Sequence, residues 1–521
     1  MGWMMIKNKI IKGIWHPFFL VNYSVLALYT FNLGEVEWTV IFRPLALMLL
    51  ISLLVLIFCR VILKTWQKAG LITTWSMLIF VSYGHVKNMI SQSNLLYWLG
   101  HHRFLLPISG LLFLLGVFLI IKKIRKPEMF SIILNAITLL LVLTSIVSIS
   151  RYFIKKSRAG KTLETTAFVP DLKLETPQNP PDIYYILLDG YTRSDVLLEK
   201  FGYDNGEFID QLEDSGFYVA QCSRSNYLHT HLVLPSLLNM DYVDSLYAQT
   251  ADSGEFDINF LNYKSKNNVV MTNLQSVGYQ TVTFETSYAW AQFDESDLYY
   301  RPVVENIFIL YISKFEELYL DTTVLSALLD WDLMRLQKFS QNIVLPNVME
   351  KNRVAFIIDR LKKIPELENP QFVFAHLVIP HPPYIFNKDG VIPNLSSYDE
   401  SWEEGKLGQQ GYINNIQYIN QEILDVVEMI LSQSETDPII IIQSDHGSEF
   451  FDRSMNFSAF YFPGGGEDVL YPSITQVNTF RLVFNQYFGT QLPILPDVSL
   501  TGKYPPFDFA PIEETYPECV Q

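Results

Sequence analysis

A carboxylate and an imidazole follow an apolar run near the end of the chain, a combination suited to metal chemistry. The run 439–442 consists of four isoleucines and leads through two polar residues into Asp445 and His446. Much earlier, the apolar run 183–188 ends at Asp189, and glycines follow both sites and permit sharp turns. Buried parallel strands read as continuous apolar runs, and ligands gather beyond their carboxyl ends. These strand ends predict a divalent metal; two ordinary turns with Asp are the alternative.

A hydroxyl between these two segments has the setting of a nucleophile. Thr230 lies in 225–239, whose second half predicts a short helix with Thr230 near its start and Pro235 in its first turn. Free backbone N–H groups and the helix dipole favour an anionic group there. A threonine hydroxyl is a weak nucleophile, and a divalent cation would activate it as it does bound water. The alternative is a plain threonine N-cap.

Other side chains near Thr230 are candidates for binding a substrate. Asn226 could orient an oxyanion through its amide, or it could only hold the turn before the helix. His229 and His231 flank Thr230 and alternate along the chain, so we expect at most one of them to point into the site. His376 lies inside an apolar strand and is interpreted as a core histidine.

Alternating strand and helix patterns must position these residues. Apolar and β-branched segments predict strands at 183–188, 217–220, 280–284, 371–378 and 439–442. Helical patterns are found between them, at about 194–215, 267–277 and 411–432. This alternation predicts an α/β fold with a mostly parallel sheet flanked by helices. Residues 290–350 break the alternation and are interpreted as an insertion without an assigned role.

The first third of the chain has the composition of a membrane region. Five apolar stretches approach the ~20 residues that a transmembrane helix needs, at about 17–33, 41–63, 69–85, 104–121 and 129–149. They mostly lack the polar face that helices of a soluble bundle would show. We therefore predict a five-helix transmembrane region at 1–151, a juxtamembrane linker at 152–181 and a catalytic domain at 182–521.

Charge divides the chain in the same way. Residues 1–161 contain 18 Lys and Arg but three Asp and Glu, whereas residues 162–521 contain 20 and 51. The acidic part is a poor candidate for binding nucleic acid, which needs positive charge. Basic residues before the first stretch and in alternate loops predict a cytoplasmic N-terminus, and five crossings place the catalytic domain outside. The basic cluster at 151–161 is expected to meet anionic lipid headgroups.

Four motifs in this order resemble the alkaline phosphatase superfamily. The resemblance is to its membrane-anchored sulfatase-like branch, with lipoteichoic acid synthases and phosphoethanolamine transferases, and it covers roughly residues 182–490. The matches are the acid after the first strand, a Thr at a helix start within Ser-Asn-Tyr-x-x-Thr, a His-Pro loop and a late Asp-His-Gly: Asp189, Thr230, His381 and Asp445–Gly447. The apolar N-terminal part looks like the layout of the lipoteichoic acid synthases.

The resemblance implies a metal-dependent transferase in the bacterial cytoplasmic membrane. Thr230 would take a phosphoglycerol or phosphoethanolamine type headgroup from a membrane lipid donor, forming a phospho-Thr intermediate. His381 would position the phosphoryl group or protonate a leaving oxygen. An envelope glycan or lipid would accept the group. The alternatives are a phosphodiesterase or sulfatase-like ester hydrolase, and a non-catalytic binding protein on the same fold.

The residues also limit the metal and the type of esterase. Asp189, Asp445, His446 and Thr230 form a four-ligand set that suits Zn²⁺ or Mn²⁺. No histidine follows His446, so ligands for a second metal are missing and we expect one ion.

Sulfatases proper use a formylglycine made from Cys or Ser within Cys/Ser-x-Pro/Ala-x-Arg. The segment that begins at Cys222 lacks the Pro/Ala and the Arg at their places, which disfavours that mechanism. Outside the membrane region only Cys222 and Cys519 could pair, and the sequence leaves open whether they do.

Overall fold

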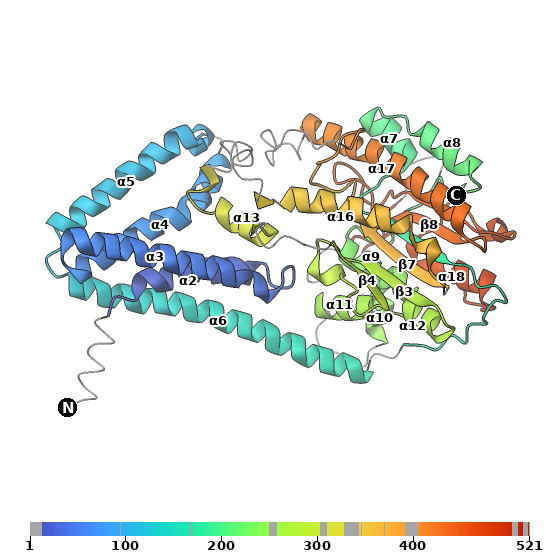
Figure 1. Cartoon of the computed structure of the whole chain (residues 1–521), viewed down its shortest axis with the longest axis horizontal. Helices are drawn as coiled ribbons and strands as arrows, with labels where there is room; N and C mark the ends of the chain where they lie inside the picture. The colour runs from blue at the N-terminus through green and yellow to red at the C-terminus, as the bar shows by residue number, and fades with distance from the viewer. Residues whose placement is uncertain are drawn as a thin grey trace. The chain divides into compact units, whose positions relative to one another are not determined.

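The chain forms two compact units, which we describe separately. In the computed structural model, one unit comprises residues 1–155 and 307–346 and the other comprises residues 156–306 and 347–521. Figure 1 labels the elements in chain order. The structure describes residues 13–93, 95–166, 169–249, 258–302, 310–327, 343–344, 346–368, 370–390, 405–502, 509–513 and 519.

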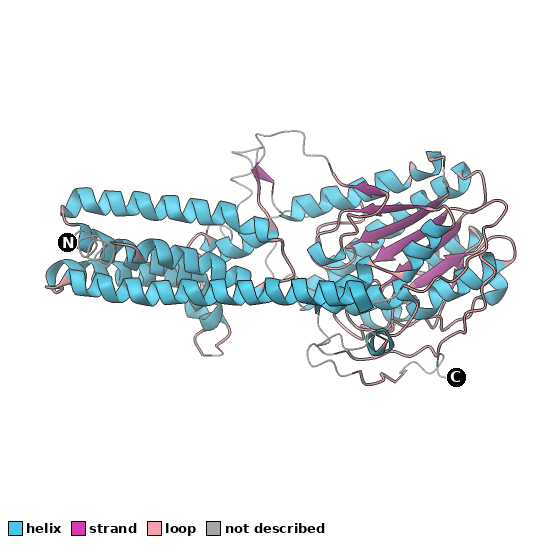
Figure 2. Ribbon diagram, turned by 90° about the horizontal axis from the view of Figure 1, so that it is seen from below, coloured by secondary structure: helices cyan, strands magenta, loops and turns pink. Residues whose placement is uncertain are grey.

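A seven-stranded sheet forms the centre of the second unit, in the order β2-β9-β8-β1-β7-β3-β4 (Figure 2). The strands are β1 (Ile183–Leu188), β2 (Tyr218–Val219), β3 (Gln280–Phe284), β4 (Leu298–Tyr300), β7 (Gln371–Leu377), β8 (Ile439–Ser444) and β9 (Ser458–Tyr461). β1 pairs in parallel with β7 and β8, and β3 with β7 and β4. Only β9 runs antiparallel to its neighbours β8 and β2. The predicted mostly parallel sheet is confirmed.

Helices pack on both faces of this sheet (Figure 2). The helices of the two cores are α7 (Ser194–Phe201), α8 (Gly206–Asp214), α9 (Thr230–Asn239), α12 (Val269–Ser276), α16 (Pro346–Leu361), α17 (Gly405–Gln433) and α18 (Gln476–Tyr487). Even-numbered residues of β1 pack in one core with α7, α8, α16 and α17, and odd-numbered residues in the other with α9, α12 and α18. This burial on both faces explains the unbroken apolar run of β1. The single helix expected at 194–215 is two, because Gly202 ends α7 at a positive φ of 67°.

The other unit contains the apolar helices. They are α2 (His16–Phe31), α3 (Phe42–Leu63), α4 (Trp66–Ser91), α5 (His102–Lys122) and α6 (Pro127–Thr166). Four segments of the described chain are long and apolar enough to cross a membrane: Trp38–Leu63, Trp66–Ser91, His102–Lys122 and Pro127–Arg158.

The expected count of five spans is therefore corrected to four among the described residues. Helix α2 has 16 residues, about 24 Å at 1.5 Å per residue, which is less than the ~30 Å hydrocarbon core. Helix α6 continues to Thr166, so the first half of the segment expected to be a linker is helical.

Part of the insertion predicted at 290–350 belongs to the unit of apolar helices. Helix α13 (Lys314–Asp321) contributes Phe315 and Tyr319 to a hydrophobic core with residues of α2, α3 and α4. The Tyr319 hydroxyl is 2.7 Å from Ser24 Oγ, and Arg43 of α3 forms an ion pair with Glu316. The apolar face of α13 and its one buried acid therefore both meet partners on these helices.

We predict that the Arg43–Glu316 pair holds α13 in place. The Glu316 side chain is 11% exposed and that of Arg43 44%. Glu316→Ala removes this pair together with the capping-box bond from the Ser313 N–H, at a cost of about 1–3 kcal/mol. The melting temperature of the detergent-solubilised protein should fall. Glu317→Ala, which removes only the pair with Lys314, is the control and should change it little. An equal effect of the two substitutions would contradict the assignment.

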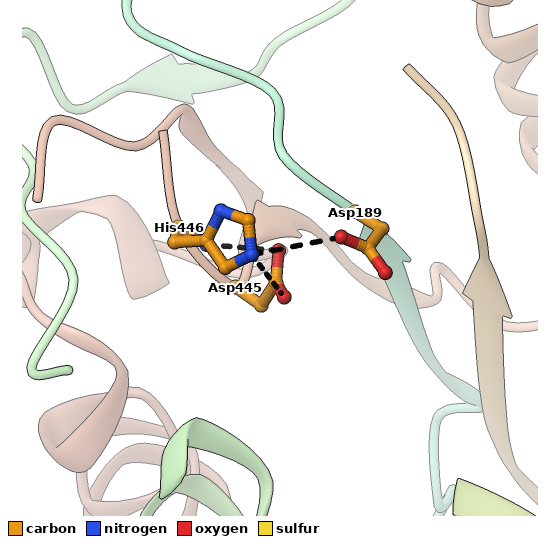
Figure 3. Close-up of side chains that lie close together, drawn as sticks. All are labelled: Asp189, Asp445 and His446. Carbon is orange, nitrogen blue, oxygen red and sulfur yellow. Dashed lines mark hydrogen bonds and ion pairs between the residues drawn. The ribbon is translucent and has the colours of Figure 1, made fainter. Parts of the chain in front are cut away.

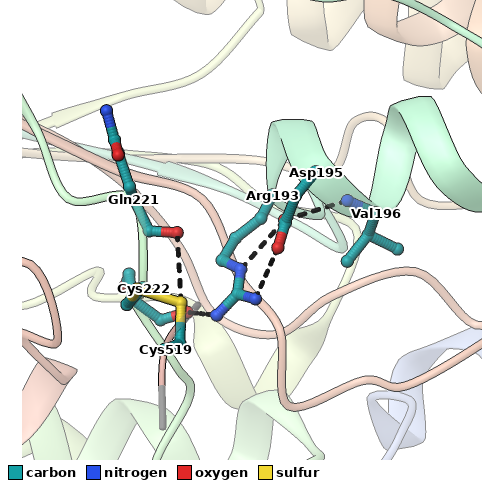
Figure 4. Close-up of a disulfide and its surroundings, with 7 residues drawn as sticks. Arg193, Asp195, Val196, Gln221, Cys222 and Cys519 are labelled. Carbon is teal, nitrogen blue, oxygen red and sulfur yellow. Dashed lines mark hydrogen bonds and ion pairs between the residues drawn. A yellow bond between two sulfur atoms is a disulfide. The ribbon is translucent and has the colours of Figure 1, made fainter. Parts of the chain in front are cut away.

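One disulfide closes the second unit (Figure 4). Cys222 and Cys519 are bonded, with 5.5 Å between their Cα atoms and a sequence separation of 297. The pairing that the sequence left open is therefore present. Disulfides of this type persist in oxidising compartments.

The disulfide predicts a pattern of thiol alkylation. Protein that is denatured without reduction should take up one alkyl group, on the free thiol of Cys59, because disulfide sulfurs are not nucleophilic thiols. After reduction it should take up three, as intact-protein mass spectrometry would show. Cys519→Ser should raise the unreduced count to two by freeing Cys222. Three groups on unreduced wild-type protein would rule out the bond.

Candidate metal centre

Two neighbouring parallel strands end at the same edge of the sheet and bring the candidate ligands together. Leu188 of β1 pairs in register with Ser444 of β8, so the next residues, Asp189 and Asp445, leave the sheet side by side. Donor atoms of Asp189, Asp445 and His446 all lie within 4.8 Å of one another (Figure 3). All three residues are at most 1% exposed. The structure thus brings together the three strand-end residues selected from the sequence.

Two glycines allow the turns beyond these strands. Gly190 has a positive φ of 78°, and its N–H donates to Asp445 Oδ1 at 3.0 Å. A Cβ on Gly447 would lie 2.5 Å from the carbonyl oxygen of Met455 and 2.8 Å from that of Asp452. A larger residue at 447 would therefore push the following loop away from the site.

The histidine and one acid offer ligand atoms to a cation. His446 Nδ1 lies 2.8 Å from the carbonyl oxygen of Gly447 and donates to it, which places the lone pair on Nε2. Nη2 of Arg453 lies 2.6 Å from Nε2, and a cation there would replace this contact. Nε2 lies 3.3 Å from Asp445 Oδ2 and 3.7 Å from Asp189 Oδ1. Asp189 Oδ1 is buried and accepts no hydrogen bond within the described part of the chain. A divalent cation would satisfy this atom and both carboxylate charges.

The predicted nucleophile is next to this group. Thr230 is the first residue of α9, and its hydroxyl donates to Asp445 Oδ2 at 2.5 Å. It is 9% exposed, so its hydroxyl lies between the buried acids and the protein surface. Pro235 lies inside the helix and not in its first turn as expected. Thr230 Oγ1 is therefore positioned to act with the same cation.

His381 lies between two acids, and their charges set its protonation. Burial alone would lower the pKa of His381, but Asp189 and Glu449 outweigh it and raise the pKa to about 10. The imidazole Nε2 is 3.4 Å from Glu449 Oε1, and this contact lowers the pKa of Glu449 to about 2. Burial would raise the pKa of Asp189, but His381, His376 and His446 outweigh it and lower it. At neutral pH, His381 is therefore a cation beside the site.

The histidines on either side of Thr230 lie together. The rings of His229 and His231 stack with 5.5 Å between their centroids, so the two imidazoles lie side by side. Burial lowers the pKa of each to about 4, and the charge of Arg453 adds to the effect. Both imidazoles are therefore neutral at pH 7 and can serve as hydrogen-bonding groups.

His376 has a role that the sequence did not reveal. Its Nε2 lies 3.3 Å from Asp189 Oδ2, and both side chains are 1% exposed. It was interpreted as a core histidine, and it is buried, but it also fixes the orientation of a candidate ligand. The signal is the register of β1 against β7, where His376 pairs with Leu187, and this cannot be read from either strand alone.

Asn226 is engaged outside the site. Its amide nitrogen lies 3.0 Å from the carbonyl oxygen of Val498 and 3.2 Å from the Tyr242 hydroxyl. Its amide oxygen accepts from the Val477 N–H at 2.8 Å. These contacts match the alternative in which Asn226 holds the turn before the helix.

Comparison with known proteins identifies the class of this fold and site. The family model described as Sulfatase matches residues 181–483, more than half of the chain. The chain therefore belongs to the sulfatase family, and it is an enzyme of the sulfatase-like superfamily. The family and the donor set together support a divalent metal at this site. No curated protein matches the sequence.

Several solved structures are similar to this chain at low sequence identity. The periplasmic domain of EptC from Escherichia coli is 11% identical, with a TM-score of 0.43, and the match covers 66% of this chain and 96% of that one. Lipooligosaccharide phosphoethanolamine transferase A from Neisseria meningitidis is 12% identical, with a TM-score of 0.37 and coverage of 91% and 94%.

The contact between His376 and Asp189 predicts an effect on metal affinity. His376→Ala should weaken binding about 10- to 100-fold, because partners that orient a ligand contribute by this amount. Zn²⁺ and Mn²⁺ affinities of the purified protein can be measured by competition with a chelator. His231→Ala, which removes a neighbouring imidazole that does not contact Asp189, should have a smaller effect. Equal affinities of wild type and His376→Ala would refute the role.

Proposed function

We propose that this protein transfers a phosphorylated headgroup from a membrane lipid to a hydroxyl group of the cell envelope. The observation that carries the proposal is the hydrogen bond from the Thr230 hydroxyl to Asp445 within the Asp189–Asp445–His446 group. This single hydrogen bond joins the nucleophile, Thr230, to a general base, Asp445, which is also one of the buried ligands.

The residues of the chain have separate roles in this reaction. One divalent ion, Zn²⁺ or Mn²⁺, bound by Asp189, Asp445, His446 and Thr230, would supply positive charge for the phosphoryl oxygens and would make the hydroxyl more nucleophilic. Asp445 accepts the proton of Thr230 as Oγ1 bonds to phosphorus. His381, whose Nε2 lies 3.4 Å from Glu449 Oε1, donates a proton to the leaving lipid oxygen as its bond to phosphorus breaks.

The second half of the reaction restores the threonine. A hydroxyl of an envelope glycan or lipid gives its proton to His381 as it attacks the phospho-Thr. The bond from phosphorus to Thr230 Oγ1 breaks, and Asp445 returns its proton to Oγ1. His229 and His231, neutral beside Thr230, can accept hydrogen bonds from the hydroxyl groups of donor and acceptor.

Loop charges and the disulfide support a catalytic unit at the outer face of the cytoplasmic membrane. The connections at 60–68 and 122–126 are basic and should lie in the cytoplasm. Helices α4 and α5 then cross between them, and α6 leads outwards. This orientation does not depend on whether α2 also crosses. The Cys222–Cys519 disulfide suits the same compartment.

A hydrolase is the second candidate, and the family match favours it. Sulfatases hydrolyse the ester of their substrate, with water as the final acceptor. The same first step could therefore end in hydrolysis here. The two reactions differ in the product made from a radiolabelled anionic phospholipid presented with envelope glycan. Diacylglycerol with labelled glycan indicates transfer, and a free labelled headgroup alone indicates hydrolysis.

Substitution of the nucleophile and of a ligand should separate metal binding from turnover. Thr230→Ala should keep the metal, because three ligands remain, and should lose turnover by at least 10³-fold, as expected for removing a catalytic nucleophile. Asp445→Ala should lose both. Metal content is measured on purified protein, and a phospho-Thr on wild type is sought by mass spectrometry after rapid denaturation. Substantial turnover by Thr230→Ala would discard the proposed nucleophile.

A further inference from the structure

The loop between β8 and β9 folds back and places Arg453 next to the candidate metal centre. The N–H of Gly447 donates to the carbonyl oxygen of Arg453 at 2.6 Å, so the chain folds back within six residues of the Asp-His-Gly motif. Asp452 stabilises the turn by accepting from the Ser454 N–H at 2.8 Å. The side chain of Arg453 is thereby brought over His446.

The guanidinium of Arg453 lies between a candidate ligand and an acid. Its Nη2 is 2.6 Å from His446 Nε2, and its Nη1 is 2.9 Å from Glu449 Oε1. Its Nε is buried and makes no hydrogen bond within the described residues. The side chain as a whole is 23% exposed, so the group also reaches solvent. Glu449 therefore holds one edge of the guanidinium while other donors remain available.

An acid links Arg453 to a second side chain beside the candidate ligands. Glu449, its ion-pair partner, also contacts His381. Arg453 and His381, linked by this acid, are both partly exposed, unlike the buried ligands.

We infer that Arg453 binds the anionic group of the substrate, together with His381. The lone pair of His446 Nε2 can serve either the guanidinium or a cation, but not both. With that lone pair committed to a cation, Arg453 keeps its ion pair with Glu449 and turns its remaining donors to another acceptor. A guanidinium presents five donors in a planar fork that fits two oxygens of a phosphate group. The inference rests on the proposed function. Arg453 lies outside the four motifs that the chain shares with the family.

The competing role is structural, with Arg453 doing no more than linking Glu449 to the loop. The two roles differ in what the substitution Arg453→Met changes. An anion-binding arginine should affect the binding of phosphate and leave the metal in place. A structural arginine should affect folding or the metal and leave intrinsic anion affinity unchanged.

The test measures anion binding by the purified, metal-loaded full-length protein. Inorganic phosphate and inorganic sulfate are titrated by calorimetry into wild type, Arg453→Met, Arg453→Lys and Arg360→Met, with the metal content of each sample measured. Arg360 is also partly exposed and lies over the ring of Tyr300 instead of the site, so it controls for loss of one positive charge. We expect about 10- to 100-fold weaker binding for Arg453→Met, the range for a hydrogen bond to a charged group. Arg453→Lys should be intermediate, because an ammonium is a point charge without the fork.

Several results would overturn the inference. Wild type that binds neither ion, Arg453→Met with unchanged affinity, or Arg453→Met that loses its metal would each exclude direct anion binding. Arg453→Lys keeps the test decisive if the methionine variant does not fold. The binding measurement needs no turnover, so it stands apart from the proposed function, which fails instead if Thr230→Ala remains active. In an active enzyme, Arg453→Met should lower kcat/KM and leave the phospho-Thr detectable.

Discussion

Two carboxylates buried at the tips of adjacent parallel strands are the constraint on which this site depends. Asp189 and Asp445 are 1% and 0% exposed, and two like charges in such a place are costly unless hydrogen bonds or positive charge compensate them. Gly190 and Thr230 donate to Asp445, and His376 contacts Asp189. One oxygen of Asp189 accepts no hydrogen bond from the residues that the structure describes, so a divalent cation would satisfy this atom and offset both charges.

The site residues that directly follow a strand could be predicted from the sequence. The contacts that depend on how strands pair and how a loop folds back could not. Asp189 and Asp445 stand out because each follows a run buried on both faces, and such runs end where parallel strands collect ligands. The contact of His376 with Asp189 depends on the register between β1 and β7. Glu449 and Arg453 lie on a loop whose path follows from Gly447, so the sequence shows charged residues there without showing that they return to the site.

The membrane part shows a similar division. Hydropathy locates all five apolar helices, because a segment that faces lipid must be apolar over most of its surface. It does not give their lengths, and α2 is shorter than its apolar stretch suggests. The sequence did not indicate that α13 belongs to this part, because the helix is mostly polar. Its apolar face is narrow and includes Phe315 and Tyr319, one turn apart. Only packing against α2 to α4 reveals where that face belongs.

Membership of the sulfatase family does not by itself fix the chemistry, because one fold supports several reactions. The sulfatase mechanism needs a cysteine or serine that can become formylglycine. Here the nearby cysteine, Cys222, is in a disulfide, and the hydroxyl at the ligands belongs to Thr230. A phosphate ester on Thr230 can be removed only when a second nucleophile, water or another hydroxyl, attacks the phosphorus. An enzyme with several membrane helices meets lipid and glycan hydroxyls at high local concentration, which is the physical reason for proposing transfer to such a hydroxyl over transfer to water.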